Sequence, residues 1–291
     1  MKKTEKALKA AWTASPFERY ARTVIKAALA EDVGRGDITT NAIVHPGAHG
    51  RGLFIAKEDF IVAGLFMAKN VFKQLDKRAV FKTYFDDGDH VKKGDIVAEV
   101  RGRLSAVLTG ERVALNFLQR MSGIATRTDM FVKKIKATDA RIFDTRKTTP
   151  CLRTFEKYAV RAGGGVNHRL GLFDSILIKD NHIKAAGGVK EAVRRVKSAH
   201  YEKMTVEVEV TTLKEVKDAI EAGVDIIMLD NMDPARMRKA VGIIDHRAFV
   251  EASGGVTIDN VLEIARTGVD FISIGGLTHS ARSVDISLEI E

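Results

Sequence analysis

Short apolar runs that end in charged or glycine-rich segments recur through the second half of the chain. They end at Asp144–Lys147, Ile178–Asn181, Val206–Glu209, Met228–Asn231, Glu251–Gly255 and Ser273–Gly276. Core strands do not need such ends for stability, whereas parallel α/β barrels gather the carboxyl ends of their strands around one mouth, where substrates bind. The pattern therefore predicts one site built from basic, acidic and backbone amide groups, a mixture that suits a polyanionic substrate carrying a metal.

The spacing of these runs predicts an α/β fold. Helical stretches at about residues 187–200, 212–222, 233–244 and 257–267 separate the runs, which is typical of a parallel sheet or barrel. Residues 222–231 and 267–276 are similar at an offset of 45 positions, about two βα units. The six or seven expected strands fit an incomplete barrel as well as a closed eightfold one.

The first part of the chain follows a different pattern. Ser15-Pro16 predicts the start of a helix that runs to about Glu31, and a second long helix is expected from Thr109. Residues 51–103 alternate short strands and turns, as in small β-sandwich modules. We therefore expect residues 1–115 to form a first domain that is separate from the barrel of residues 116–276.

Composition limits the classes of function. Lys plus Arg exceed Asp plus Glu by 47 − 38 = 9 among 291 residues, which admits nucleic acid, an anionic membrane surface or small acidic substrates. Aromatic residues make up only 7%, which disfavours a nucleic-acid-binding protein. A single cysteine excludes an internal disulfide, and no run of 18 apolar residues or signal sequence is present, so a cytoplasmic protein is expected.

Five potential cations occur within 34 residues, and several directly follow apolar runs. Guanidinium groups hold carboxylates in a bidentate way, and lysine serves as a mobile point charge. A solvated basic face is the alternative, but the position after strands favours an anion site. The five residues are Arg146, Lys147, His168, Arg169 and Lys179.

Acidic residues and glycine pairs complete the candidate site. Glu209 and Asp230 end successive strands and suit Mg²⁺, sugar hydroxyls or acid–base chemistry, with a structural ion pair as the alternative. Glu207 shares the strand face of Glu209, as a co-ligand or, deeper in the barrel, as the partner of a lysine. Two glycine-rich ends, Ser253-Gly254-Gly255 and Gly275-Gly276, offer backbone amides to a phosphate, although a glycine pair often marks only a tight turn.

Three other residues are candidates for the same site. His182 and His279 lack partners at metal-ligand spacing, so structural hydrogen bonding is expected of both. Cys151 follows Pro150 beside several cations that lower a thiol pKa, but no pairing with a base is evident.

Together these segments resemble the quinolinate phosphoribosyltransferase family. The matching blocks run in family order over nearly the whole chain: Glu31–Thr40, Glu111–Asn116, Ser122–Thr126, Asp144–Pro150, Gly163–Arg169, Lys179–His182, Val206–Glu209, Leu229–Asn231 and Glu251–Gly255. The resemblance implies that residues 1–115 form an N-terminal helix and α/β sandwich, residues 116–276 an incomplete TIM-like α/β barrel, and residues 277–291 a tail that returns to the N-terminal domain. It also implies a homodimer, with further assembly left open. A related phosphoribosyltransferase that acts on another acid is the nearest alternative.

The resemblance also implies a role for each site residue. Quinolinate would be held by Arg146, His168, Arg169, Lys179 and, from the neighbouring subunit, Arg112. Phosphoribosyl pyrophosphate would be held by Lys147, Glu209, Asp230, Ser253, Gly254, Gly255, Gly275 and Gly276, and it would carry Mg²⁺ toward Glu209 and Asp230. The chain departs from the family where Cys151 replaces the usual glycine and Gly276 a common alanine.

Overall fold

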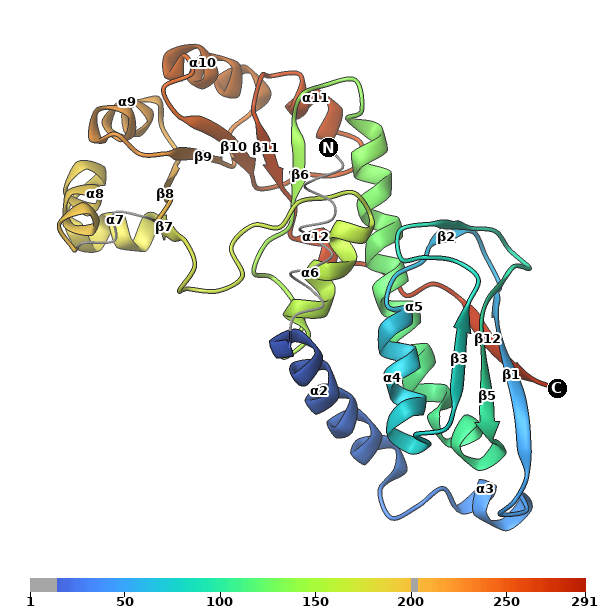
Figure 1. The fold of residues 1–291 in the computed structure, drawn as a ribbon. Helices are drawn as coiled ribbons and strands as arrows, with labels where there is room; N and C mark the ends of the chain where they lie inside the picture. Colours follow the sequence, from blue (N-terminus) through green and yellow to red (C-terminus); the bar gives the residue numbers. More distant parts are fainter. Residues whose placement is uncertain (1–14, 200–203) are drawn as a thin grey trace. The chain divides into compact units, whose positions relative to one another are not determined.

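The computed structural model of the chain describes residues 15–199 and 204–291 (Figure 1). One compact unit holds the described residues up to Ala125 together with Arg282–Glu291, and a second holds Thr126–Ala281. The domain limits expected from the sequence, 115/116 and 276/277, stay predictions. Residues 1–14, the start of the predicted first domain, and residue 200, the predicted end of a helix, are not among those described. No helix in the described ranges is long and apolar enough to cross a membrane.

The first unit contains a four-stranded antiparallel sheet in the order β12-β1-β5-β3. Its strands are β1 (His49–Ala56), β3 (Val80–Thr83), β5 (Ile96–Arg103) and β12 (Ile286–Ile290), and β2 (Phe60–Ile61) pairs separately with β4 (His90–Val91). The helices are α2 (Ser15–Val33), α3 (Ile38–Ile43), α4 (Leu65–Leu75) and the first part of α5 (Leu104–Lys134). Phe54, Phe72 and Phe81 lie with ring centroids 5.7, 6.0 and 6.1 Å apart and supply much of the apolar core.

The two helices expected in this part are present. α2 ends at Val33, two residues beyond the predicted limit, whereas α5 begins at Leu104, five residues before the predicted start. β5 continues directly into α5, and the backbone N–H of Arg103, the last residue of β5, donates to the carboxylate of Asp76 at 3.2 Å. Thr109, expected to begin the helix, instead donates its hydroxyl to Asp37 Oδ2 at 3.0 Å.

The second unit contains a six-stranded parallel sheet in the order β6-β11-β10-β9-β8-β7. The strands are β6 (Arg141–Phe143), β7 (Ile176–Ile178), β8 (Val206–Val210), β9 (Ile226–Asp230), β10 (Phe249–Ser253) and β11 (Phe271–Ser273). β6 and β7 form the two open edges of this described sheet, so the predicted incomplete barrel is confirmed. β9 and β11 lie on either side of β10, as their similarity in sequence predicted.

Helices follow the strands and pack against one another in chain order around the sheet (Figure 1). They are α6 (Arg153–Ala162), α7 (Asp180–Ala186), α8 (Val189–Ser198), α9 (Leu213–Ala222), α10 (Pro234–Ile244), α11 (Val261–Ala265) and α12 (Gly276–His279). α8, α9 and α10 were predicted, α11 is shorter than predicted, and α6, α7 and α12 were not. Side chains cap α9 and α10, where Thr212 Oγ1 and Asp233 Oδ1 accept backbone N–H groups at 3.2 and 2.9 Å.

Alternation along β8 decides which side chains face the interior of the sheet. Val206, Val208 and Val210 are buried on one face, and Glu207 and Glu209 share the other. Valines fit the face covered by helices, so both carboxylates are directed to the inner face of the incomplete barrel. The fold thus places acidic groups at two depths along one strand.

Candidate active site

Residues from neighbouring strands meet at the carboxyl edge of the parallel sheet. Lys179 directly follows β7, and its ammonium group forms an ion pair with Glu209 on β8. Asp230 and Ser253 end β9 and β10 and stand opposite each other in the register. The structure therefore brings these predicted residues to adjacent positions, as the convergence of parallel strand ends requires.

Asn231 connects Asp230 with the turn after β10. Its backbone is in the left-handed region, with φ 52°, and its N–H donates to the carbonyl of Ser253 at 2.9 Å. Its side-chain Nδ2 donates to Asp230 Oδ2 at 2.8 Å. A Cβ on Gly254, where φ is 92°, would lie 2.2 Å from Asn231 Oδ1. Glycine is therefore required here both by conformation and by close approach.

Lys147 lies against the second glycine pair. A Cβ on Gly275 would approach Lys147 Cδ to 2.8 Å and His279 Nε2 to 3.2 Å. The hydroxyl of Thr278 donates to the backbone carbonyl of Lys147 at 2.8 Å. The loop after β6 and the turn after β11 thus meet, as the register of these two parallel strands allows.

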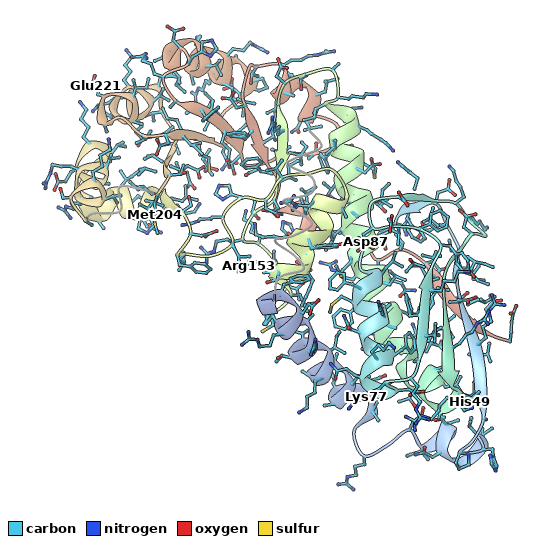
Figure 2. All side chains as sticks on the ribbon, in the orientation of Figure 1. His49, Lys77, Asp87, Arg153, Met204 and Glu221 are labelled. Carbon is cyan, nitrogen blue, oxygen red and sulfur yellow. The ribbon has the colours of Figure 1, made fainter. Side chains whose placement is uncertain are left out.

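The loop between β6 and α6 presents Arg146 and Lys147 with exposed side chains. Glu156 on α6 accepts the backbone N–H of Thr149 at 3.0 Å and its hydroxyl at 2.8 Å, which anchors the middle of the loop. Arg153, labelled in Figure 2, donates Nε to Thr148 Oγ1 at 3.0 Å. The two cations therefore project from a loop that α6 holds in place.

Cys151 ends the same loop in a conformation that suits glycine. Its φ is 63°, a left-handed value that costs a residue with a Cβ of the order of 1 kcal/mol or more. The side chain is exposed. Cysteine in place of the glycine that the resemblance predicts therefore strains the backbone of this loop.

Arg169 belongs to the same cationic group. Burial lowers its pKa, and the charge of Arg146 lowers it further. The two like charges therefore disfavour each other, and a bound anion would offset this effect. Arg169 Nη1 donates to the carbonyl of Ser175 at 3.1 Å, which directs the guanidinium.

A buried network supports the segment that carries these cations. The carboxylate of Asp144, at the end of β6, forms an ion pair with Lys157 on α6, and both side chains are almost wholly buried. Asp144 also accepts the side-chain N–H of Asn167 at 2.6 Å and the backbone N–H of His168 at 2.9 Å. Asp144 therefore fixes the start of the loop that carries Arg146 and Lys147.

His168 faces two carboxylates on the inner side of the sheet. Its Nε2 lies 3.0 Å from Glu207 Oε2 and 3.7 Å from Glu251 Oε2, and all three side chains are nearly inaccessible to solvent. Burial alone would lower the pKa of His168, but Glu207 and Glu251 outweigh burial and raise it. Burial and then the charge of Glu207 raise the pKa of Glu251 to about 8. Glu207 is thus the deeper group foreseen as one alternative, but it faces a histidine rather than a lysine.

The remaining predicted residues lie in varied surroundings. Arg112 is exposed on α5, in the first unit. His182 Nδ1 accepts the backbone N–H of Lys179 at 2.9 Å, and His279 Nδ1 lies 2.6 Å from Ser280 Oγ. The hydrogen-bonding roles expected for these two histidines are confirmed.

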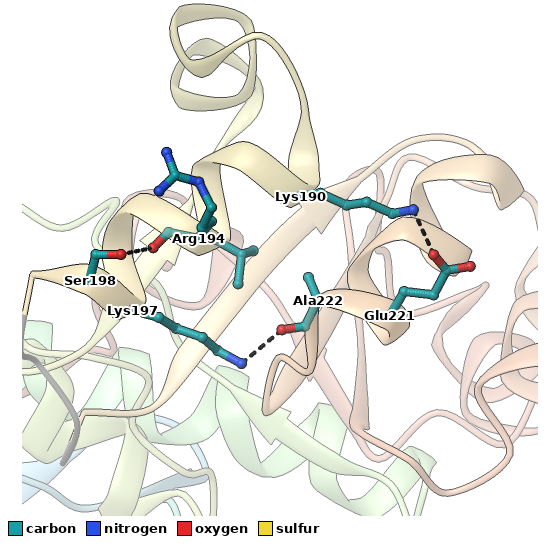
Figure 3. Close-up of a pocket in the computed structure, with 7 residues that line it drawn as sticks. Lys190, Arg194, Lys197, Ser198, Glu221 and Ala222 are labelled. Atoms are coloured by element: carbon teal, nitrogen blue, oxygen red, sulfur yellow. Dashed lines mark hydrogen bonds and ion pairs between the residues drawn. The ribbon is translucent and has the colours of Figure 1, made fainter.

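Several basic side chains line a cavity of about 500 Å³ between α8 and α9 (Figure 3). Lys190 pairs with Glu221 at 2.6 Å, and Lys197 donates to the carbonyl of Ala222 at 2.7 Å. Arg194 pairs with Glu191 on its own helix. These charges are already engaged, and the cavity lies on the helices rather than at the strand ends, so we do not assign the site to it.

Sequence reasoning missed Glu251 and Asn231. Glu251 precedes Ser253 by two residues on β10, so alternation along the strand places both on one face. That signal was available, but an apolar strand with one internal carboxylate gave no hint of its partner on another strand. Asn231 was visible beside Asp230, but its contact with Gly254 depends on the folded turn.

Comparisons with known proteins agree over nearly the full length. Residues 37–122 match the family described as quinolinate phosphoribosyl transferase, N-terminal domain, and residues 124–289 match its C-terminal domain. A probable nicotinate-nucleotide pyrophosphorylase (carboxylating) of Bacillus subtilis is 44% identical over 260 residues, which cover 89% of this chain and 90% of the relative. One from Methanocaldococcus jannaschii is 45% identical over 280 residues, covering 93% and 97%.

A solved structure gives the same result in three dimensions. The crystal structure of NadC from Streptococcus pyogenes has a TM-score of 0.91 and 43% identity, and covers 96% of this chain and 98% of its own. Both halves of the chain therefore match one family in sequence, and nearly the whole chain matches in fold. This chain belongs to the quinolinate phosphoribosyltransferase family.

Proposed function

We propose that the protein transfers the phosphoribosyl group of phosphoribosyl pyrophosphate to quinolinate and releases pyrophosphate and carbon dioxide. The product is nicotinate mononucleotide, a precursor of NAD. The names of the relatives in Bacillus and Methanocaldococcus support this reaction. The observation that carries the proposal is the meeting of cations and strand-end carboxylates along one edge of the sheet.

Quinolinate is a dianion, and we assign its carboxylates to the cationic group. Burial and then the charge of Arg146 lower the pKa of Arg169, and Lys179 directly follows β7 at the carboxyl edge of the same sheet. A bidentate contact from a guanidinium orients a planar carboxylate, which a lysine cannot do alone. His168 was predicted with this group, and its Nε2 faces the buried carboxylates of Glu207 and Glu251.

Phosphoribosyl pyrophosphate is assigned to the carboxylates and glycine turns. Glu209 and Asp230 would accept hydrogen bonds from ribose hydroxyls, and Lys147 would neutralise charge on the pyrophosphate. The turns formed by Ser253, Gly254, Gly255, Gly275 and Gly276 would donate backbone amides to the 5-phosphate. The close approach of Asn231 to Gly254 and of Lys147 to Gly275 supports this assignment, because both glycines keep the turns narrow.

The residues at the strand ends fit a bound Mg²⁺ ion. Mg²⁺ prefers oxygen ligands and keeps several waters, so one or two carboxylates with the substrate's phosphates suffice. Asp230 is partly exposed at the carboxyl end of β9. Glu209 lies on the adjacent strand β8, opposite Met228, which is two residues before Asp230. When bound, the ion would neutralise the leaving pyrophosphate.

The proposed chemistry needs no side chain as a nucleophile. The ring nitrogen of quinolinate forms a bond to C1 of the ribose as the bond from C1 to pyrophosphate breaks, and the nitrogen becomes a pyridinium. The adjacent carboxylate then leaves as carbon dioxide, and its bonding electrons stay on the ring carbon until water supplies a proton. Preorganised cations beside the ring stabilise that negative charge.

We also propose a homodimer in which Arg112 reaches the site of the neighbouring subunit. Its exposed side chain on α5 supports this, because it is available for such a contact. Mixing an Arg112→Ala variant with a Lys147→Ala variant should restore part of the lost activity through hybrid dimers. No recovery after confirmed subunit exchange would contradict a shared site.

The central test is an assay with quinolinate, phosphoribosyl pyrophosphate and Mg²⁺ that measures nicotinate mononucleotide and carbon dioxide together. Nicotinate, which lacks the second carboxylate, should react poorly. Arg146→Ala should weaken quinolinate binding by about 2–5 kcal/mol, seen as a raised KM. Arg238→Ala, at an exposed position on α10, is the matched control and should leave KM unchanged. Turnover of nicotinate without quinolinate turnover would refute the proposal.

A further inference from the structure

Arg153 on α6 connects two loops through its guanidinium group, and the proposed reaction gives this residue no role. Its Nε donates to Thr148 Oγ1 at 3.0 Å, and its Nη2 donates to the backbone carbonyl of Arg146 at 3.3 Å. Its Nη1 donates to the backbone carbonyl of Leu170, in the loop after α6, at 3.1 Å. All three nitrogen atoms are therefore engaged, and each acceptor is a neutral oxygen rather than a carboxylate.

The two loops are those that carry the arginines assigned to quinolinate. Arg146 lies in the loop before α6, and Arg169 directly precedes Leu170 in the loop after it. Because Arg153 contacts a main-chain oxygen in each loop, it fixes where both arginines leave the backbone without occupying the Arg146 guanidinium. A guanidinium group is planar and rigid, so acceptors bound to it keep a constant separation.

Lys157 on the same helix reaches the same two loops. It lies four residues after Arg153, so both side chains leave one face of α6. Its Nζ pairs with Asp144 in the loop before α6 and donates to the carbonyl of His168 in the loop after it, at 2.9 Å. Each loop is therefore held from α6 by both side chains, and the contacts in the second loop flank Arg169 on either side.

We infer that Arg153 is a positioning residue that sets the separation of Arg146 and Arg169, and that this separation selects a ligand with two carboxylates. The inference rests on the proposed function and deepens it, because it assigns the preference for a dicarboxylate to a residue that does not itself touch the substrate. A ligand that engages both guanidinium groups gains from their fixed separation, whereas a monocarboxylate such as nicotinate engages only one.

A contribution to stability alone is the competing explanation for these hydrogen bonds, and Arg247 provides a matched control. Its Nε donates to the backbone carbonyl of Ile244 at 3.0 Å, and its Nη2 donates to that of Ile243. Arg247 precedes β10 at the amino edge of the sheet, opposite the strand ends that form the site. Loss of either arginine removes hydrogen bonds of the same kind, so only a positioning role predicts a change in substrate preference that is confined to Arg153.

The test is Arg153→Lys, which keeps the charge but has one nitrogen where arginine has three. The KM for quinolinate should rise about tenfold or more, and the calorimetric ratio of the Kd for nicotinate to that for quinolinate should fall about fivefold or more. The KM for phosphoribosyl pyrophosphate should stay within about twofold, because Thr278 Oγ1 holds the carbonyl of Lys147 independently of α6.

Arg247→Lys should change neither the KM for quinolinate nor the preference between the two acids. Three results would overturn the inference: equal increases in KM for both substrates in Arg153→Lys, an unchanged preference for quinolinate over nicotinate, or the same loss of preference in Arg247→Lys.

Arginine ¹⁵N NMR of the unmodified protein provides a readout that does not depend on how a variant folds. The Nε–H of Arg153 should exchange with solvent about tenfold or more slowly than that of the exposed Arg238. Saturating quinolinate should shift the Nε resonances of Arg146 and Arg169 more than that of Arg153. Exchange as fast as at Arg238, or a quinolinate-induced shift at Arg153 as large as at Arg146, would overturn the inference. Failure to turn over bound quinolinate would instead refute the proposed function, because solvent exchange and the calorimetric preference are measured without turnover.

Discussion

Replacing Lys157 with methionine should destabilise the protein by about 3–5 kcal/mol. The Lys157 and Asp144 side chains are 1% and 0% exposed, so the substitution leaves a carboxylate buried without its cation. Lys157 Nζ also donates to the backbone carbonyl of His168 at 2.9 Å, and that acceptor would lose its partner too. The size of the effect comes from desolvation of the remaining charge rather than from the attraction that is lost.

Urea unfolding followed by circular dichroism measures this free energy. Lys184→Met is the matched control, because Lys184 pairs with Asp180 at 3.3 Å with 75% and 54% of the two side chains exposed. Solvated pairs contribute about 1 kcal/mol or less. The double variant Lys157→Met/Asp144→Asn should lose clearly less than the sum of the single changes, since it removes the orphaned charge. If Lys157→Met costs no more than Lys184→Met, the argument from burial is wrong.

Three further changes test other parts of the structure. Cys151→Gly should keep full activity and raise the free energy of unfolding by up to about 1 kcal/mol, because glycine adopts the left-handed backbone without strain. The greater entropy of glycine in the unfolded chain limits this gain. Abolished turnover in a folded variant would contradict the prediction. As the pH rises from about 5 to 8, the unfolding free energy of the wild type should fall relative to that of Glu251→Gln by up to about 1.4 kcal/mol per pH unit. The reason is that the pKa of Glu251 is about 8 in the folded state against an ordinary 4.5, so only the folded state keeps the proton in this range. Parallel pH curves for the two proteins would count against the prediction. Gly254→Ala should raise the KM for phosphoribosyl pyrophosphate about tenfold or more through displacement of Asn231, whereas Gly242→Ala, with open space at its Cβ, should not.

Much of the second unit could be predicted because each strand carries its own signal. The apolar runs and their polar ends gave the parallel order of β8, β9 and β10, and alternation placed Glu207 and Glu209 on one face. Local rules of this kind depend on neighbours in the sequence, so a single chain reveals them. The same rules found α9 and α10, whose caps lie within three residues of the helix starts.

Contacts between distant residues could not be predicted in the same way. Lys157 lies in a helix with several charges, and its sequence gives no sign that it is buried against Asp144. Glu251 meets His168 across 83 positions of the chain, since 251 − 168 = 83. The environment of His168 therefore became visible only in the fold, although the residue itself was identified. The type and approximate position of the site residues could be predicted from the sequence, but the direction in which each side chain points could not.

The ion pair between Lys179 and Glu209 shows why the two proposed subsites cannot be treated as separate. Lys179 is assigned to a carboxylate of quinolinate and Glu209 to the ribose, yet each is the ion-pair partner of the other in the structure. With 44% of the Lys179 side chain exposed, the pair is not sealed, so an arriving carboxylate can compete for the ammonium group. Binding of quinolinate would then release Glu209 for the sugar, and binding of the sugar would release Lys179 for quinolinate. Because such coupling is reciprocal by thermodynamic necessity, the loss of either residue should affect the affinity for both substrates.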